Sequence, residues 1–170
     1  MKRSFSLFVL VLVTVAMTAG EASANTNVFT WFHDNFRFSD RSVNQICGFR
    51  VQFHAFGPYK AVDQYDNDGV LFRSIVTSGG GGYHFTATAN GVTLETQASY
   101  MIIYTFNPDG SVASLREDGL HFGFTAPGEG IVLVDTGRLD VDPETGEILF
   151  EGGPRQFLHG DLDAFCAAFR

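Results

Sequence analysis

The sequence predicts an all-β protein, an antiparallel up-and-down β-barrel of about eight strands with a short C-terminal helix. From Phe49 onward, short stretches alternate apolar and polar residues with the period of a strand. Turns rich in Gly, Pro, Asn and Asp separate these stretches, and helical periodicity is absent until the last ten residues. Consecutive hairpins of this number form a meander, and a long meander usually closes into a barrel because closure removes exposed edges.

The first 24 residues predict a cleaved export signal. Met1–Arg3 is a short basic start, Phe5–Met17 is almost continuously apolar, and Ala22–Ala24 supplies small residues for a signal peptidase. We expect cleavage after Ala24. The apolar stretch is shorter than the roughly 20 residues that a membrane span requires. The mature protein is therefore expected to be secreted, extracellular and without a membrane span.

The remaining 146 residues are enough for one domain with a sizeable core. The chain carries a net charge of −8, and removal of Lys2, Arg3 and Glu21 leaves nine basic and eighteen acidic residues, a charge of −9. So acidic a surface repels nucleic acid and anionic lipid, which disfavours both as partners. A monomer is expected.

Residues 25–46 are interpreted as an aromatic N-terminal arm and residues 47–170 as a single barrel domain. The arm and a closing helix over residues 161–169 are expected to cover strands that are apolar on both faces. Asn90-Gly91 is the strongest hairpin signal, because both central residues of a type I′ turn need positive φ. The expected strands span residues 49–56, 70–77, 83–89, 92–106, 111–117, 120–125, 131–141 and 147–150. The aromatics expected in the core are Phe85, Phe106, Phe122, Phe124 and Phe150.

Two cysteines, Cys47 and Cys166, lie near the two ends of the predicted domain. In an exported protein such a pair predicts a structural disulfide. Closing a loop of this size removes unfolded-state entropy worth on the order of 4–5 kcal/mol in the chain-entropy model. The alternative is two buried free thiols. A reactive thiol is disfavoured because no Cys-x-x-Cys motif is present.

No motif in the sequence predicts catalysis, a metal site or a cofactor. The five histidines are scattered singly, without the spacings of zinc ligands. The acidic runs 63–69 and 140–144 match hairpin turns better than calcium loops. There is no Gly-x-Ser-x-Gly elbow, and residues 79–82 lack the Lys that a phosphate loop requires.

Strand periodicity leaves four candidate ligand-binding residues: Arg50, His54, His84 and His121. If their strand faces point into the barrel, they line a polar pocket, with Glu95, Arg116 or Asp135 as charged partners. If these faces point outward, the residues are ordinary solvent-facing side chains. A small barrel of this kind is either filled by its own side chains or encloses one small ligand.

The chain contains turn-rich segments at residues 93–96, 107–111, 119–122, 127–130, 136–138, 152–154 and 163–166. Their order resembles that of small secreted proteins of high-GC Gram-positive bacteria. The resemblance covers the chain from Cys47 to Cys166 and implies export, a disulfide and a β-barrel, but no catalytic residue. A second resemblance, in strand number and Gly-punctuated hairpins alone, is to the allene oxide cyclase and dirigent type of barrel, which binds apolar precursors.

These observations favour a non-catalytic exported barrel that binds a small apolar molecule or a cell-envelope component. The first alternative is an enzyme of cyclase or isomerase type, in which Arg50, His54, His84 and His121 face an apolar substrate. The second is a structural or protein-docking role in the cell envelope, with residues 25–32 as a docking strand.

Overall fold

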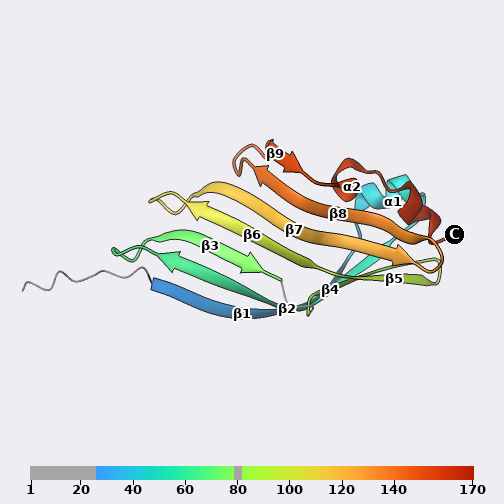
Figure 1. The fold of residues 1–170 in the computed structure, drawn as a ribbon, viewed down its shortest axis with the longest axis horizontal. Helices are drawn as coiled ribbons and strands as arrows, with labels where there is room; N and C mark the ends of the chain where they lie inside the picture. The colour runs from blue at the N-terminus through green and yellow to red at the C-terminus, as the bar shows by residue number, and fades with distance from the viewer. Residues whose placement is uncertain (1–25, 79–81) are drawn as a thin grey trace, which may run out of the picture.

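The computed structural model describes residues 26–78 and 82–170; the predicted signal segment and residues 79–81 of the glycine-rich connection lie outside them. The described residues form one antiparallel sheet of nine strands with three short helices (Figure 1). None of the helices is long and apolar enough to cross a membrane. The elements are β1 (Thr26–Phe38), α1 (Arg41–Cys47), β2 (Gln52–Tyr65), β3 (Leu71–Thr77), β4 (His84–Ala89), β5 (Val92–Gln97), β6 (Ser99–Phe106), β7 (Val112–Ala126), β8 (Gly130–Val141), β9 (Ile148–Gly152), α2 (Gln156–His159) and α3 (Asp163–Ala167).

The sheet is antiparallel, as predicted, but it is not a simple meander, because β4 pairs with β2 and β3 pairs with β6. One edge of β2 pairs with β1, while the other pairs with β4 along its first half and with β3 along its second half. β5 pairs with β4, β6 pairs with β3, and Ala98 alone separates β5 from β6. The order then continues through β7, β8 and β9.

The predicted closure into a barrel is not confirmed. In the described part of the chain no ladder joins β1 to β9, so hydrogen bonds do not close the sheet. The three helices gather at the end of the sheet where the C-terminus lies (Figure 1). There α1 and α3 contact each other, and α2 and α3 contact β8.

Three element boundaries differ from the sequence-based expectation. The N-terminal arm forms β1, which pairs with β2 over all thirteen of its residues, and α1. β2 continues through Gly57-Pro58 instead of ending there. β7 is a single strand of fifteen residues that passes through Asp118-Gly119, where we expected a hairpin turn.

The core lies on the inner face of the sheet, defined here as the face that carries Phe53, Phe85 and Phe124. α3 adds Phe165 to this aromatic cluster and the turn after α3 adds Phe169, and both are at most 1% exposed. The predicted disulfide between Cys47 and Cys166 joins α1 to α3, with the two Cα atoms 5.1 Å apart. Phe150 was wrongly assigned to the core: it is exposed on β9, under the guanidinium of Arg138.

A row of glycines crosses the sheet where neighbouring backbones come closest. Gly119 and Gly137 are paired on β7 and β8, and both have positive φ inside a strand. A Cβ at Gly119 would overlap the carbonyl oxygen of Ser99, and a Cβ at Gly137 would overlap that of Gly152. Only glycine permits this approach, which bends a strand locally. The glycine row comprises Gly57, Gly82, Gly119, Gly137 and Gly152.

Replacing Gly119 by Ala is expected to lower the free energy of unfolding by about 2–4 kcal/mol, because the new Cβ combines an unfavourable φ with overlap against the β6 backbone. Gly110→Ala is the matched control. Gly110 also has positive φ but stands in open space, so its cost is about 1 kcal/mol. Urea denaturation measures both variants, and equal losses would show that close backbone approach at Gly119 is unimportant.

Candidate functional site

The structure divides the four predicted ligand-binding residues between the two sides of the sheet. His54 alternates with the buried Phe53 and Ala55, so its side chain lies on the outer face, opposite the inner face. His84 pairs with Phe56 on the same outer face, and Arg50 precedes β2 with its guanidinium donating to Gln52 at 3.3 Å. His121 is the only one of the four that lines a pocket on the inner face.

On the outer face, the candidate histidines contact neighbouring side chains. The His54 ring nitrogen Nε2 lies 2.7 Å from Oδ1 of Asn35. The ring of Phe56 packs against the rings of both His54 and His84. A polar hollow of about 300 Å³ lies between the side chains of Arg37, Gln52, His54, Thr86 and Thr88. These residues are half-buried or exposed, as expected for a solvent-facing sheet surface.

His121 lines a cavity of about 160 Å³ that combines ionisable groups with apolar walls. β7 and β8 supply the floor, and α2 with the residue before it supplies the opposite wall. We call this cavity the polar pocket, and it is lined by Glu117, His121, Phe122, Asp135, Leu139, Arg155, Phe157 and Leu158.

A buried ion pair anchors the polar pocket. Nη1 of Arg155 donates to Oδ1 of Asp135 at 2.9 Å, and the two side chains are only 2% and 7% exposed. The second guanidinium nitrogen of Arg155 donates to the carbonyl of Gly137 at 3.2 Å, and the second oxygen of Asp135 accepts from the backbone N–H of Leu158 at 3.3 Å. The pair thus fixes the start of α2 against β8.

Two polar atoms of the polar pocket have no hydrogen-bond partner among the described residues. They are Nε of Arg155 and Nε2 of His121, and both are buried. A buried polar group without a partner costs about 1–3 kcal/mol. Both atoms belong to residues that line the same cavity, which marks it as a place where a ligand group would gain hydrogen bonds.

Burial holds His121 in its neutral form. The imidazole stacks on Tyr100, with ring centroids 4.3 Å apart, and its Nε2 lies 3.4 Å from Oε2 of Glu117. Desolvation lowers the pKa of His121 and the charge of Arg155 lowers it further, whereas Glu117 and Asp135 oppose this shift. Desolvation prevails, so Glu117 lies beside an uncharged ring at pH 7.

A line of tyrosines connects the polar pocket to β1. The ring of Tyr100 meets that of Tyr83 edge-on at 6.2 Å, and the Tyr83 hydroxyl donates to Oδ2 of Asp34 at 2.7 Å. Burial, followed by this hydrogen bond, raises the pKa of Tyr83, and burial also raises the pKa of Tyr100. Both phenols therefore remain neutral donors across the physiological range.

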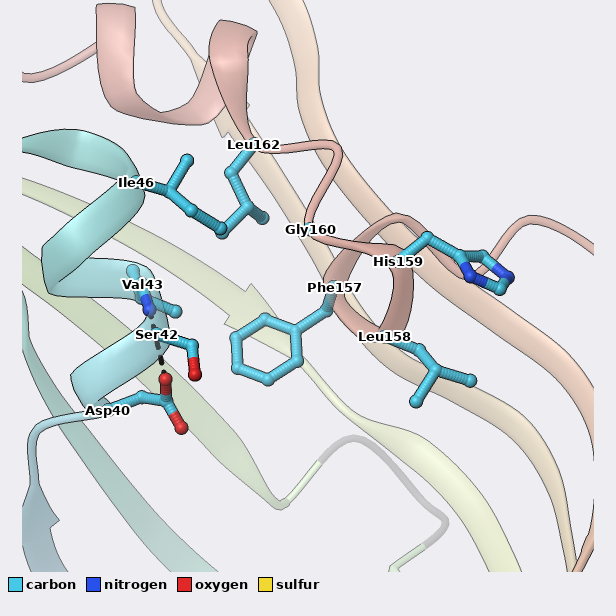
Figure 2. Close-up of a pocket in the computed structure, with 9 residues that line it drawn as sticks. All are labelled: Asp40, Ser42, Val43, Ile46, Phe157, Leu158, His159, Gly160 and Leu162. Atoms are coloured by element: carbon cyan, nitrogen blue, oxygen red, sulfur yellow. Dashed lines mark hydrogen bonds between the residues drawn. The ribbon is translucent and has the colours of Figure 1, made fainter. Parts of the chain in front are cut away.

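A larger groove of about 360 Å³ lies between α1 and α2 (Figure 2). Its walls include Val43, Ile46 and Leu162, and Phe157 projects into the space between the helices. Asp40 is occupied as the N-cap of α1, accepting from Val43 N at 2.9 Å. His159 points away from this space in Figure 2 and pairs with Glu151 at 2.6 Å. Because Phe157 and Leu158 line both hollows, this apolar groove adjoins the polar pocket.

Sequence reasoning found only part of the polar pocket. His121 was a candidate and Asp135 one of its possible partners, but Glu117 and Arg155 were missed. The two other suggested partners lie elsewhere, Glu95 exposed on β5 and Arg116 in an ion pair with Asp118 at 2.6 Å. Arg155 follows Gly-Gly-Pro in an irregular segment, so no periodicity indicated where its side chain would point.

No group of three or more potential metal ligands occurs in residues 26–78 and 82–170. Comparison of the chain with family models, with curated proteins and with solved structures finds no match in any of the three.

The pH dependence of stability tests the environment of His121. Because the folded state holds the pKa of His121 below that of the unfolded chain, about 6.5, unfolding takes up a proton as the pH falls below 6.5. The free energy of unfolding should fall through this range in the wild type and fall less in His121→Gln. His84→Gln, on the outer face of β4, is the control. A wild type that gains stability relative to His121→Gln at low pH would mean that Glu117 holds the ring protonated.

Proposed function

We propose that this chain is an exported, non-catalytic binding protein for a small amphipathic molecule, whose polar group occupies the polar pocket. The observation that carries the proposal is that Nε2 of His121 and Nε of Arg155 are buried on the wall of one cavity and make no hydrogen bond within the described residues. Ligand sites characteristically combine apolar walls with a few convergent polar groups.

The charges of the polar pocket favour a hydroxyl group over a carboxylate. Arg155 and Asp135 neutralise each other, His121 is neutral, and Glu117 adds a negative charge that repels an anionic ligand. A hydroxyl can donate to Glu117 and accept from Nε of Arg155 at the same time. We therefore infer an apolar alcohol as the ligand class.

The adjoining apolar groove would hold the apolar body of the ligand. Phe157 and Leu158 separate the two hollows, so a molecule longer than the polar pocket would extend across them toward Ile46 and Leu162. Apolar surface buried in this way contributes about 25 cal/mol per Å². Phe122 and Leu139 would contribute further apolar contacts beside the polar group.

Export is supported by two features of the chain. The first 24 residues have the basic, apolar and small-residue parts of a signal peptide. The disulfide between Cys47 and Cys166 is of a kind that persists in oxidising compartments. We place the protein outside the cytoplasm on these grounds.

An enzyme of isomerase or cyclase type is the second candidate, favoured by the Glu117–His121 pair. A carboxylate 3.4 Å from a neutral imidazole is a common arrangement for proton transfer. In that function Arg155 would stabilise negative charge on a substrate oxygen, and Arg50, His54 and His84, on the outer face, would have no part in the reaction.

Native mass spectrometry of the protein secreted by a high-GC Gram-positive host tests the proposal. We expect extra mass that disappears on denaturation and belongs to an apolar alcohol. Glu117→Gln should reduce the affinity for the compound so identified by about tenfold, since a charged acceptor contributes roughly 1.5–3 kcal/mol. Glu95→Gln, on the exposed side of β5, should leave it unchanged.

A bare protein under these conditions would contradict the proposal. Equal affinities in the two variants would remove the polar pocket from binding. Conversion of the bound compound during incubation, abolished by His121→Gln, would instead establish the enzyme.

A further inference from the structure

β1 is a long outer strand of the sheet with one side unpaired. All thirteen residues from Thr26 to Phe38 pair with β2, and no described strand pairs with the opposite side of β1. A free edge presents N–H and C=O groups that can template another strand. The opposite end of the sheet differs, because β9 has only five residues and short edges resist pairing.

β1 carries few of the features with which natural proteins protect such an edge. Within residues 26–38 there is no Pro and no Lys. Of its two charged residues, Asp34 is bound to the Tyr83 hydroxyl on the inner face, and Arg37 is next to the last residue of the strand.

Exposed aromatic side chains lie on both faces of the same strand. Trp31 is 72% exposed and Phe29 is 65% exposed on the outer face. Phe32 and Phe36 are exposed on the inner face, where Phe32 also stacks on Tyr59 with ring centroids 4.9 Å apart. Large aromatics beside a free edge would lose this exposed area if another strand paired there.

We propose that β1 pairs antiparallel with β1 of a second copy of this chain, forming a two-fold dimer with a continuous sheet. In a two-fold dimer each copy uses the same surface, so the strand must be complementary to its own reverse. Phe32 is the midpoint of β1, and placing it on the two-fold axis pairs the strand along its full length.

This central register meets the requirements of charge and packing. Trp31 lies opposite the partner's His33, and Thr30 lies opposite the partner's Asp34, to which its hydroxyl can donate. Val28 lies opposite the partner's Phe36 on the inner face. No like charges meet, and each pair keeps inner-face side chains on the inner face, because residues opposite each other in an antiparallel pair point to the same side.

The dimer is independent of the proposed ligand site. The polar pocket is built on β7, β8 and α2, whereas the interface uses β1 alone. Failure of one proposal therefore leaves the other intact.

Light scattering during size-exclusion chromatography tests the dimer, and we expect twice the mass of one chain. Trp31 is the only tryptophan of the chain. Its emission should therefore shift to longer wavelength on dilution as the interface separates. Trp31→Lys, which places a charge beside the edge, should raise the dissociation constant by about tenfold or more. Leu149→Lys, on the exposed part of β9, is the matched control and should leave it unchanged.

Cysteine crosslinking tests the register. Phe32→Cys places one thiol of each copy near the two-fold axis, where opposite Cα atoms lie about 4.5–5.5 Å apart, within disulfide range. Mild oxidation should give a crosslinked dimer on a non-reducing gel, whereas Leu149→Cys should remain monomeric. A wild type with the mass of one chain and emission independent of concentration would overturn the proposal. So would a dimer that Leu149→Cys crosslinks and Phe32→Cys does not, or one whose affinity is unchanged in Trp31→Lys.

Discussion

The close backbone contacts along the glycine row are the constraint on which the rest of the structure depends. Gly119 contacts the β6 backbone on one side and pairs with Gly137 on the other, and Gly137 contacts Gly152 in turn. A side chain at either position would force these strands apart. The row therefore allows neighbouring strands to bend together, so that one end of the sheet curls around Phe53 and Phe124 while the hairpin tips at the other end remain open.

The polar pocket follows directly from this arrangement. Glu117 and His121 are two residues before and after Gly119, so they flank the row on β7. Asp135 is two residues before Gly137, whose carbonyl accepts a hydrogen bond from Arg155. The disulfide between α1 and α3 then holds the helices at the curled end, where α2 forms the far wall of the pocket. The ionisable groups of the polar pocket thus lie where the backbone is most constrained, which keeps their geometry fixed before any ligand binds.

The local signals of the sequence predicted most of the strands, several of the hairpins between them and the cysteine pair. Alternation such as Tyr83 to Ala89 is reliable because one face of that strand is buried and the other is not. It failed for β1, where Val28, Phe29 and Trp31 put apolar residues on both faces of an edge strand. The turn signal failed at Asp118-Gly119, because a glycine that permits close approach of two backbones looks the same in the sequence as a glycine in a turn. Whether the sheet closes into a barrel, and where Arg155 lies, depend on long-range contacts that no local pattern encodes.

The most direct test of this account is the proximity of His121, Tyr100 and Tyr83, which the arrangement of the strands beside the glycine row brings together. Nuclear Overhauser spectroscopy of isotope-labelled protein measures it without knowledge of any ligand. The account predicts cross-peaks between the ring protons of His121 and Tyr100, and between those of Tyr100 and Tyr83. A His121 ring without contacts to Tyr100 would contradict this arrangement of the strands, and the polar pocket with it.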